Sequence, residues 1–441
     1  MSLTELLRRQ AELALLRTKT APADLDFCEL PSPAFIIDER LLRANLELLN
    51  AIEAAAGVKI LLAQKAYSLF NTYPLIGRYL SGAAASGYQE ARLAYEFMQK
   101  EVQVFSPAFS SGELEATLPY ADKLIFNRLR QVEQHYELLT AEMRRRYSED
   151  LPPLKIGLRL NPEYSEVETD LYNPAAPGSR LGTTAALLAA DRAELEARDP
   201  LRAEAVLDLI TGLHVHCLCE EDFPPLRAVV DQLVERFKPY LERANWVNLG
   251  GGHHLTRADY QLAELIPFLR EFKARYDLED LYLEPGEAIC YDAGWLNCRV
   301  LDLQPNQVEN AILDVSATCH TPDVLEMPYR PRLFLARRGG EQLVAGDPAE
   351  LRYSYRLGGP SCLAGDIFGD YSFPVELEPG DQLVFCDMAL YTHVKTTMFN
   401  GMWHPDLVLY RGEGRGFCHL KRFTFADFVT RLGDDSLTLT F

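Results

Sequence analysis

The sequence predicts an α/β protein in which a (β/α)8 barrel of the TIM type precedes a C-terminal, mainly β domain built as a β-barrel or sandwich. Three observations lead to this prediction. Short apolar runs of β type alternate with helical segments, eight such runs follow one another, and together they occupy about 230 residues. We expect three parts along the chain: a helical extension at 1–30, the barrel at 31–288 and the β domain at 289–441.

The eight barrel runs are each four to eight residues long and mostly apolar. In chain order they are VKILLA (58–63), GAAAS (82–86), VQVF (102–105), DKLIF (122–126), LKIGLRL (154–160), ITGLHVHC (210–217), WVNLG (246–250) and LYLE (281–284). Between most of them lie stretches with helical periodicity, such as 129–146 and 226–244. GAAAS and VQVF have the weakest strand pattern.

Past about residue 290 helical periodicity fades and β-type runs dominate, which indicates a second domain. These runs are CRVLDLQ (298–304), QVENAILDV (307–315), PRLFLARR (331–338), DQLVFCD (381–387) and DLVLYRG (406–412). AFIID (34–38), ahead of the barrel, is a further strand. It either pairs with the second domain or leads into the barrel.

Composition and charge limit the possible partners. The net charge of −20 argues against nucleic acid or an anionic membrane as a partner, and it is compatible with a cationic substrate. No apolar stretch approaches the roughly 20 residues that span a bilayer, and the charged N-terminus does not resemble a signal peptide. The nine cysteines include no CxxC pair, so reduced thiols and a cytoplasmic protein are expected.

Four unusual features fall at the C-terminal ends of the predicted barrel strands, where barrel active sites lie. Lys65 follows the first run, His216 ends the sixth, GGG (250–252) follows the seventh and Glu284 closes the eighth. Each also has an ordinary explanation. Lys65 could be a solvated rim charge, the histidines at 214 and 216 could bind a metal, and the glycines could form a tight turn. Glu284 could pair with Arg159.

Together these four features describe a site for pyridoxal 5'-phosphate (PLP). The lysine forms a Schiff base with the cofactor, and the imidazole of His216 can stack on the pyridine ring. Gly250, Gly251 and Gly252 can hold the phosphate. The carboxylate of Glu284 keeps the pyridine nitrogen protonated, so that the ring acts as an electron sink.

Further motifs carry a resemblance to a known family. The motifs are LLAQKAYS, IFN, IGLRLNP, NPAAPGSRLG, HCLCE, WVNLGGG, YLEPGEAI, SCLAGD and YTHVKTTMFNG. In type and order, from about residue 30 to the C-terminus, they resemble those of the fold-type III PLP-dependent decarboxylases. This group contains the ornithine, arginine and diaminopimelate decarboxylases, and within it the likeness is to the carboxynorspermidine/carboxyspermidine branch.

The resemblance implies roles for further residues. Arg159 would support Glu284, and Tyr391 would reach the phosphate. The relatives work as homodimers, so Cys362 and Asp366 would complete the active site of the partner subunit. Cys362, or an acid near it, would protonate the carbanion. Asp323 would contact the substrate.

One departure from the family pattern indicates the substrate. The ornithine and diaminopimelate enzymes typically have arginine after EPG, where this chain has Glu287. A glutamate favours an amine over a distal carboxylate, which suits carboxynorspermidine or carboxyspermidine as substrate. The alternatives are ornithine, arginine or diaminopimelate decarboxylase, an inactive homologue that acts as a regulatory binding protein, and a barrel metallohydrolase built on His214 and His216.

Overall fold

The computed structural model describes residues 2–17, 20–412 and 414–434. It divides into two compact units, one of Met1–Ala14 and Asn45–Ile289 and one of Leu15–Ala44 and Cys290–Phe441. Within the described ranges no helix is long and apolar enough to cross a membrane.

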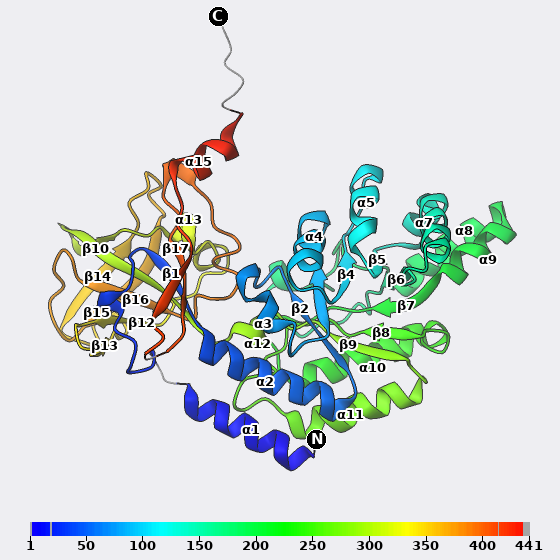
Figure 1. Cartoon of the computed structure of the whole chain (residues 1–441), viewed down its shortest axis with the longest axis horizontal. Coiled ribbons are helices and arrows are strands. Elements are labelled where there is room, and N and C mark those ends of the chain that lie inside the picture. Colours follow the sequence, from blue (N-terminus) through cyan, green and yellow to red (C-terminus); the bar gives the residue numbers. More distant parts are fainter. Residues whose placement is uncertain (1, 18–19, 413, 435–441) are drawn as a thin grey trace, which may run out of the picture. The chain divides into compact units, whose positions relative to one another are not determined.

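The first unit is a closed barrel of eight parallel strands, which confirms the predicted fold class (Figure 1). The strands are β2 (Lys59–Ala63), β3 (Gly82–Ala85), β4 (Glu101–Phe105), β5 (Lys123–Phe126), β6 (Lys155–Arg159), β7 (Ile210–His214), β8 (Trp246–Asn248) and β9 (Asp280–Leu283). All eight lie within or overlap the predicted runs. The barrel closes where Ile60 of β2 pairs with Leu283 of β9.

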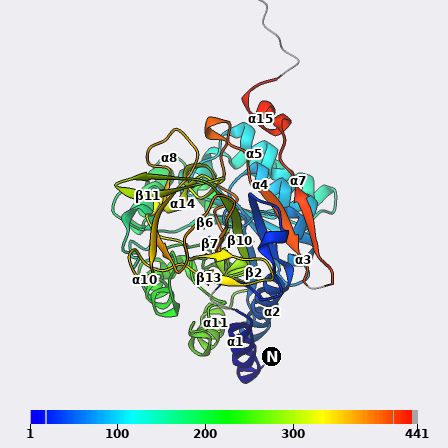
Figure 2. The same ribbon diagram turned by 90° about the vertical axis from the view of Figure 1, so that its left-hand side faces the viewer.

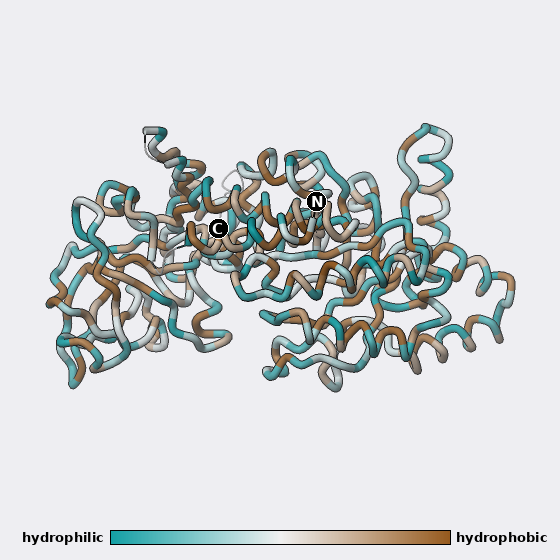
Figure 3. The backbone as a smooth tube through the Cα atoms, turned by 90° about the horizontal axis from the view of Figure 1, so that it is seen from below, coloured by the Kyte–Doolittle hydropathy of each residue, from teal (hydrophilic) through white to brown (hydrophobic). Residues whose placement is uncertain are grey.

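Helices precede, connect and follow the barrel strands. They are α2 (Glu39–Ala56), α3 (Tyr73–Ile76), α4 (Tyr88–Phe97), α5 (Ser111–Thr117), α6 (Leu129–Gln134), α7 (Tyr136–Ser148), α8 (Ala185–Arg198), α9 (Pro200–Leu209), α10 (Phe223–Leu241), α11 (Leu262–Arg275) and α12 (Glu287–Cys290). Along the long helices polar and apolar residues alternate, as amphipathic packing requires (Figure 3). The predicted helical stretch 129–146 is two helices, because His135 leaves the helical conformation between α6 and α7.

The barrel interior is filled by large side chains that glycines accommodate. Leu61, Ile125, Trp246 and Tyr282 form a buried cluster. The indole of Trp246 lies against the backbone of β7, where a Cβ at Gly212 would be only 1.8 Å from it. The glycine in β7 is therefore required by the tryptophan in β8, and the barrel is packed rather than open.

The N-terminal helix α1 (Leu3–Leu16) belongs for most of its length to the first unit. Its apolar face buries Leu6 and Leu13. The side-chain amide of Gln10 donates hydrogen bonds of 2.9 Å to the carbonyl oxygens of Arg257 and Tyr260. These bonds attach the helix to the loop before α11.

The second unit is built on a sheet of ten strands, part of which faces the viewer in Figure 2. The strands are β1 (Ala34–Asp38), β10 (Gly294–Asn306), β11 (Val308–Leu313), β12 (Leu333–Ala336), β13 (Gln342–Val344), β14 (Tyr353–Gly358), β15 (Ile367–Phe373), β16 (Gln382–Cys386), β17 (Asp406–Tyr410) and β18 (Phe417–Lys421). The short helices of this unit are α13 (Ala317–His320), α14 (Asp323–Glu326) and α15 (Phe425–Leu432).

The strand at 34–38, whose place the sequence leaves open, pairs within this second sheet. β1 is antiparallel to β10 and parallel to β17. All five of its residues are buried. The sequence does not predict β13, β14, β15 or β18, because these strands are short or carry polar residues on a partly exposed face.

Candidate active site

A pocket opens at the C-terminal ends of the barrel strands. Its lining residues lie on β2, β3, β4, β6, β7 and β9 or directly after them: Ala63, Lys65, Ala84, Ala85, Ser86, Gln103, Phe105, Arg159, His214, His216 and Glu284. Four residues that the sequence predicts for the site are among them, namely Lys65, Arg159, His216 and Glu284. Parallel strands that end at the same rim bring these residues together.

The amine of Lys65 lies against the ring of His216. Nζ of Lys65 is 3.1 Å from Nε2 of His216. On the other side of the ring, Nδ1 accepts a hydrogen bond of 2.8 Å from the N–H of Gly251. A ring nitrogen that accepts a hydrogen bond carries no proton, so a neutral His216 has its proton on Nε2. That proton is donated to the lone pair of Lys65, which requires the lysine to be a neutral amine.

The surroundings of both groups also favour their neutral forms. The Lys65 side chain is open to water within the pocket, but protein surrounds it closely. This desolvation and the charge of Arg159 lower the pKa of Lys65 from its ordinary 10.5. Burial and the neighbouring Lys65 lower the pKa of His216 well below 6.5. A neutral lysine is the form that reacts with an aldehyde.

We expect Lys65 in the apoprotein to react with aldehydes at lower pH than an ordinary lysine does. The rate constant rises with pH while the amine loses its proton and levels off above the amine's pKa, which lies below 10.5. Stopped-flow absorbance with pyridoxal, which lacks the phosphate, measures this rate against pH. If the rate constant levelled off only at the pH at which that of free N-acetyl-lysine does, or at a higher pH, the expectation would be contradicted.

Glu284 is the residue directly after β9, and both oxygens of its carboxylate have hydrogen-bonding partners. Oε1 accepts a hydrogen bond of 2.6 Å from Nδ2 of Asn248, and Oε2 lies 3.4 Å from Nε2 of His214. Burial alone would raise the pKa of Glu284, but His214, Lys65 and the Asn248 hydrogen bond lower it below 4.5. Burial lowers the pKa of His214, so its ring is neutral and donates from Nε2. Glu284 is therefore a buried anion with a fixed orientation.

Arg159 does not form the salt bridge with Glu284 that is one ordinary explanation of that carboxylate. Both residues are described, and the ion-pair partner of Glu284 is His214 instead. The guanidinium lies 4.5 Å from the ring centroid of Phe105, and Nη2 donates a hydrogen bond of 3.0 Å to the carbonyl oxygen of His216. Burial lowers the pKa of Arg159 to about 10. The arginine thus positions the backbone of His216.

Gly250, Gly251 and Gly252 form a turn after β8 that side chains would block. Gly250 and Gly252 have φ of +73° and +85°. A Cβ at Gly251 would lie 2.0 Å from the carbonyl oxygen of Glu284. The N–H of Gly250 donates a hydrogen bond of 2.8 Å to Oδ1 of Asn248, while that of Gly251 donates to His216. The turn therefore holds site residues in place, because two of its N–H groups are bonded to Asn248 and His216 and its glycines allow close backbone packing.

Cys362 and Asp366 belong to the second unit and lie in one loop before β15. The Cys362 side chain is exposed, and its backbone N–H donates a hydrogen bond of 2.8 Å to Oδ1 of Asn400. Asp366 is 3% exposed, and its carboxylate accepts hydrogen bonds from the hydroxyls of Ser316 (2.8 Å) and Ser361 (2.6 Å). In this unit the aspartate fixes the loop that carries the thiol.

Asp323 and Tyr391 also belong to the second unit. Asp323 is the first residue of α14, and its carboxylate accepts a hydrogen bond from the ammonium of Lys395. Tyr391 has φ of +45°, a strained value for a residue with a large side chain. Its carbonyl oxygen accepts hydrogen bonds of 3.0 Å from the N–H groups of Val394 and Lys395, which closes the turn.

Several residues that build the pocket are not predicted as site residues from the sequence. In the barrel interior Asn248 donates hydrogen bonds to Glu284 and to Gln103, and the ring of His214 stacks on that of Phe105 at 5.7 Å. A polar residue within an apolar strand, as in VQVF and WVNLG, is the signal that could have identified the first two. His214 is a candidate metal ligand in the sequence, but among the described residues no group of three or more His, Cys, Asp and Glu could hold a metal.

Comparison with known proteins identifies the class. Residues 34–389 match the family model described as "Pyridoxal-dependent decarboxylase, C-terminal sheet domain". The chain belongs to this family of PLP-dependent decarboxylases, which confirms the predicted enzyme class and cofactor.

Particular relatives cover nearly the whole chain. A carboxyaminopropylagmatine decarboxylase from Synechocystis sp. is 41% identical over 92% of this chain and 96% of its own length. A carboxynorspermidine/carboxyspermidine decarboxylase from Campylobacter jejuni is 35% identical over 91% of this chain and 99% of its own. The crystal structure of carboxynorspermidine decarboxylase from Campylobacter jejuni, complexed with norspermidine, is similar with a TM-score of 0.75. It is 34% identical and covers 91% of this chain and 100% of its own.

The pocket residues fit PLP. A lysine amine, an imidazole beside it and a buried carboxylate line one pocket, and the glycine turn is bonded to that imidazole through the N–H of Gly251. The carboxylate of Glu284 lines the pocket and has acceptor positions beyond those used by Asn248 and His214, so it can also accept a pyridinium N–H. When bound, PLP supplies a ring that takes up the electron pair released as CO2 leaves.

Proposed function

We propose that this enzyme decarboxylates a carboxylated polyamine, carboxynorspermidine or carboxyspermidine, and releases norspermidine or spermidine in polyamine biosynthesis. The observation that carries the proposal is Glu287, the residue after Glu284-Pro285-Gly286 at the mouth of the barrel. The names of the Campylobacter jejuni relatives support it.

Glu287 is well placed to meet a cationic substrate. It is the first residue of α12, and its side chain is 13% exposed. Its Oε2 is 3.7 Å from Nδ1 of His254. Glu287 lies three residues after Glu284, which lines the pocket, so the chain places it just beyond that glutamate.

The charge of Glu287 discriminates between substrates of this family. A carboxypolyamine carries ammonium groups beyond its α-carbon, which a half-buried carboxylate attracts. Diaminopimelate carries a second carboxylate at its far end, which Glu287 repels. Ornithine carries a single side-chain amine close to its α-carbon. The longer chain of a polyamine is therefore better suited to a second carboxylate, Glu287, beyond Glu284.

Carboxyaminopropylagmatine is a second candidate substrate, because the Synechocystis relative that acts on it is 41% identical to this chain. Its agmatine end carries a guanidinium where a triamine carries an ammonium. A carboxylate binds a guanidinium through two parallel hydrogen bonds, so Glu287 suits this group as well. Both substrates share a cationic chain attached to an α-amino acid.

We expect Glu287→Arg to raise the KM for a carboxypolyamine about 100-fold and Glu287→Gln about tenfold, with smaller changes in kcat. The substitutions reverse or remove a charge that binds the substrate away from the reacting bond. Steady-state CO2 release measures both constants. Glu279→Gln is the control, because Glu279 pairs with Lys155 at 3.3 Å outside the pocket. A KM for Glu287→Arg within twofold of wild type would contradict the proposal.

The first unit supplies the residues proposed to hold the cofactor. Lys65 would hold the cofactor through its aldehyde, and the substrate's α-amine would displace this amine. His216 would stack on the ring, and Glu284 would hold a proton at the pyridine nitrogen, with Arg159 supporting Glu284. Gly250–Gly252 would hold the phosphate. The amine of Lys65 would also serve in release of the product amine.

The second unit supplies the residues proposed to complete the reaction. Tyr391 reaches the phosphate, and Asp323 and Asp366 contact the substrate. The thiol of Cys362 donates a proton to the former α-carbon after CO2 has left. The exposed position of this thiol supports a role outside its own unit's core.

We further propose that the enzyme is a cytoplasmic homodimer in which each Cys362 serves the partner's active site. Exposed apolar side chains near the Cys362 loop, Leu363 (44%), Phe399 (45%) and Trp403 (59%), support an interface there. All nine cysteines, each of them described, are outside disulfides, as a reducing compartment favours.

Subunit mixing tests this arrangement. Lys65→Ala and Cys362→Ala each inactivate a homodimer, but a mixed dimer has one site with both native residues. Unfolding and refolding an equal mixture should restore about a quarter of wild-type activity, because half of the dimers are mixed and each has one intact site. If Cys362 serves its own chain's site, no mixed dimer has an intact site and the mixture stays inactive.

A further inference from the structure

We propose that Asn248 and Gln103 are positioning residues that connect Glu284 through the barrel interior to an ion cluster at the N-terminal ends of the strands. Through this connection the barrel would hold the proton at the cofactor's pyridine nitrogen. The inference rests on the proposed placement of that nitrogen at Glu284.

The connection follows from the alternation of side chains along a strand. Residues two apart on a strand point to the same face. On β9, Asp280 and Tyr282 therefore share the inner face with the position of Glu284, and on β4 Glu101 shares it with Gln103. The inner layers of such barrels are usually apolar, so a continuous polar path through them is unusual.

Hydrogen bonds join these residues in one chain. Nδ2 of Asn248 donates to Oε1 of Glu284 at 2.6 Å and to Oε1 of Gln103 at 2.9 Å. Nε2 of Gln103 donates to Oε1 of Glu101 at 2.8 Å. Asn248 is 0% and Gln103 1% exposed, so water does not compete for these bonds.

The carboxylate of Glu101 sets the direction of the whole chain. An ionised carboxylate only accepts hydrogen bonds, so Gln103 must turn its NH2 group to Glu101 and its oxygen to Asn248. Asn248 must then present its NH2 group to Gln103 and Glu284. Its remaining oxygen accepts the N–H of Gly250 at 2.8 Å. Asn248 thus fixes both the carboxylate and the first residue of the glycine turn.

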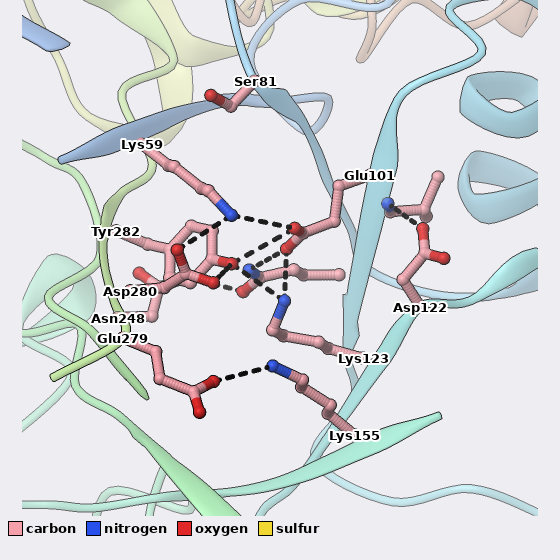
Figure 4. Close-up of polar contacts among 12 residues, drawn as sticks. Lys59, Ser81, Glu101, Asp122, Lys123, Lys155, Asn248, Glu279, Asp280 and Tyr282 are labelled. Atoms are coloured by element: carbon pink, nitrogen blue, oxygen red, sulfur yellow. Dashed lines mark hydrogen bonds and ion pairs between the residues drawn. The ribbon is translucent and has the colours of Figure 1, made fainter. Parts of the chain in front are cut away.

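Glu101 is itself held by a cluster of charges, shown in Figure 4. Nζ of Lys123 donates to Oε1 of Glu101 at 2.6 Å and to the hydroxyl of Tyr282 at 2.8 Å. The single proton of that hydroxyl has two acceptors, Oδ2 of Asp280 at 3.0 Å and Oε2 of Glu101 at 3.1 Å. Lys59 pairs with Asp280 at 2.8 Å beside them. The positive charges of the lysines balance the negative charge of the Glu101 carboxylate. Glu101 therefore stays an acceptor and keeps the amide of Gln103 in one orientation.

The test uses Gln103→Leu, which is similar in size, removes the amide and leaves both Asn248 and Glu284 in place. Two measurements are made on each variant: the dissociation constant of PLP for the apoprotein, and the nitrogen-15 chemical shift of bound PLP labelled at the pyridine nitrogen, at neutral pH. The second reports proton sharing at that nitrogen, which a merely structural role would not move.

In Gln103→Leu we expect the nitrogen-15 shift to move toward that of neutral pyridine and the dissociation constant to rise about tenfold, the effect of losing one charge-assisted hydrogen bond. Gln103→Met, which also lacks the amide, should move both in the same direction. If Gln103→Leu does not fold, Gln103→Met carries the test. Lys155→Met is the matched control, since Lys155 lies at the same end of the barrel but pairs with Glu279 (Figure 4).

The Glu284→Gln variant distinguishes a failure of this inference from a failure of the proposed placement of the pyridine nitrogen at Glu284. If Glu284→Gln leaves the nitrogen-15 shift unchanged, the placement of the pyridine nitrogen is wrong. If Glu284→Gln moves the shift while the folded Gln103 variants keep the wild-type shift and dissociation constant, the placement stands and the positioning role is overturned.

Discussion

Lys65→Ala is expected to abolish decarboxylation, with a loss in kcat of at least about a thousandfold, because no other group can hold the cofactor aldehyde as an exchangeable Schiff base. Lys65→Arg should be equally inactive, since a guanidinium keeps the charge but is not a nucleophile. CO2 release measures the first effect. The visible absorbance of the bound cofactor, which requires the Schiff base, measures the loss of the link.

Lys155→Ala is the matched control for this prediction. Lys155 begins a barrel strand, but it lies at the opposite end from the pocket and pairs with Glu279. Its variant should keep the wild-type rate and the wild-type absorbance. A Lys65→Ala enzyme that retained both properties would remove the lysine from the reaction.

Glu284→Gln is expected to lower kcat about 100-fold, with a smaller change in KM. The amide keeps the size of the side chain and the contact with Asn248, but it cannot stabilise a proton at the pyridine nitrogen, and the ring is then a weaker electron sink. Steady-state CO2 release measures the effect. Loss of this buried anion also changes the electrostatic surroundings of His214 and Lys65. Both residues lie close enough to Glu284 to alter its pKa.

Glu284→Asp separates chemistry from packing. It keeps the charge but shortens the side chain, so the rate should fall between those of wild type and Glu284→Gln. A Glu284→Gln rate within threefold of wild type would show that this carboxylate does not act on the cofactor.

The barrel and the central residues of its site could be predicted from the sequence, because both depend on local sequence patterns. Each apolar run became a strand, and the rule that barrel sites gather at C-terminal strand ends brought Lys65, His216 and Glu284 into one pocket. The positions of these residues at strand ends were sufficient to place them together, because parallel strands in a closed barrel share one rim.

Contacts that depend on barrel closure could not be predicted in the same way. Asn248 on β8 and Gln103 on β4 meet only because the register of a closed barrel directs both side chains inward. Arg159 was the obvious partner for Glu284 by charge, yet it stacks on Phe105, and the neutral His214 takes its place. Charge alone does not identify a partner when uncharged donors are nearer.

Cofactor chemistry and substrate choice depend on different residues in this account. We propose that Lys65 and Glu284 serve any amino acid that reaches the cofactor, whereas Glu287 meets the part of the substrate that remains after CO2 leaves. The shared cationic chain of carboxynorspermidine, carboxyspermidine and carboxyaminopropylagmatine is therefore the feature that the pocket is expected to select.

Steady-state CO2 release by the purified enzyme from each candidate substrate tests the central claim most directly. The panel comprises carboxynorspermidine, carboxyspermidine, carboxyaminopropylagmatine, diaminopimelate and ornithine. We expect a kcat/KM for at least one of the three carboxylated polyamines about 100-fold or more above those for diaminopimelate and ornithine. Turnover of diaminopimelate or ornithine at equal or greater efficiency would contradict it.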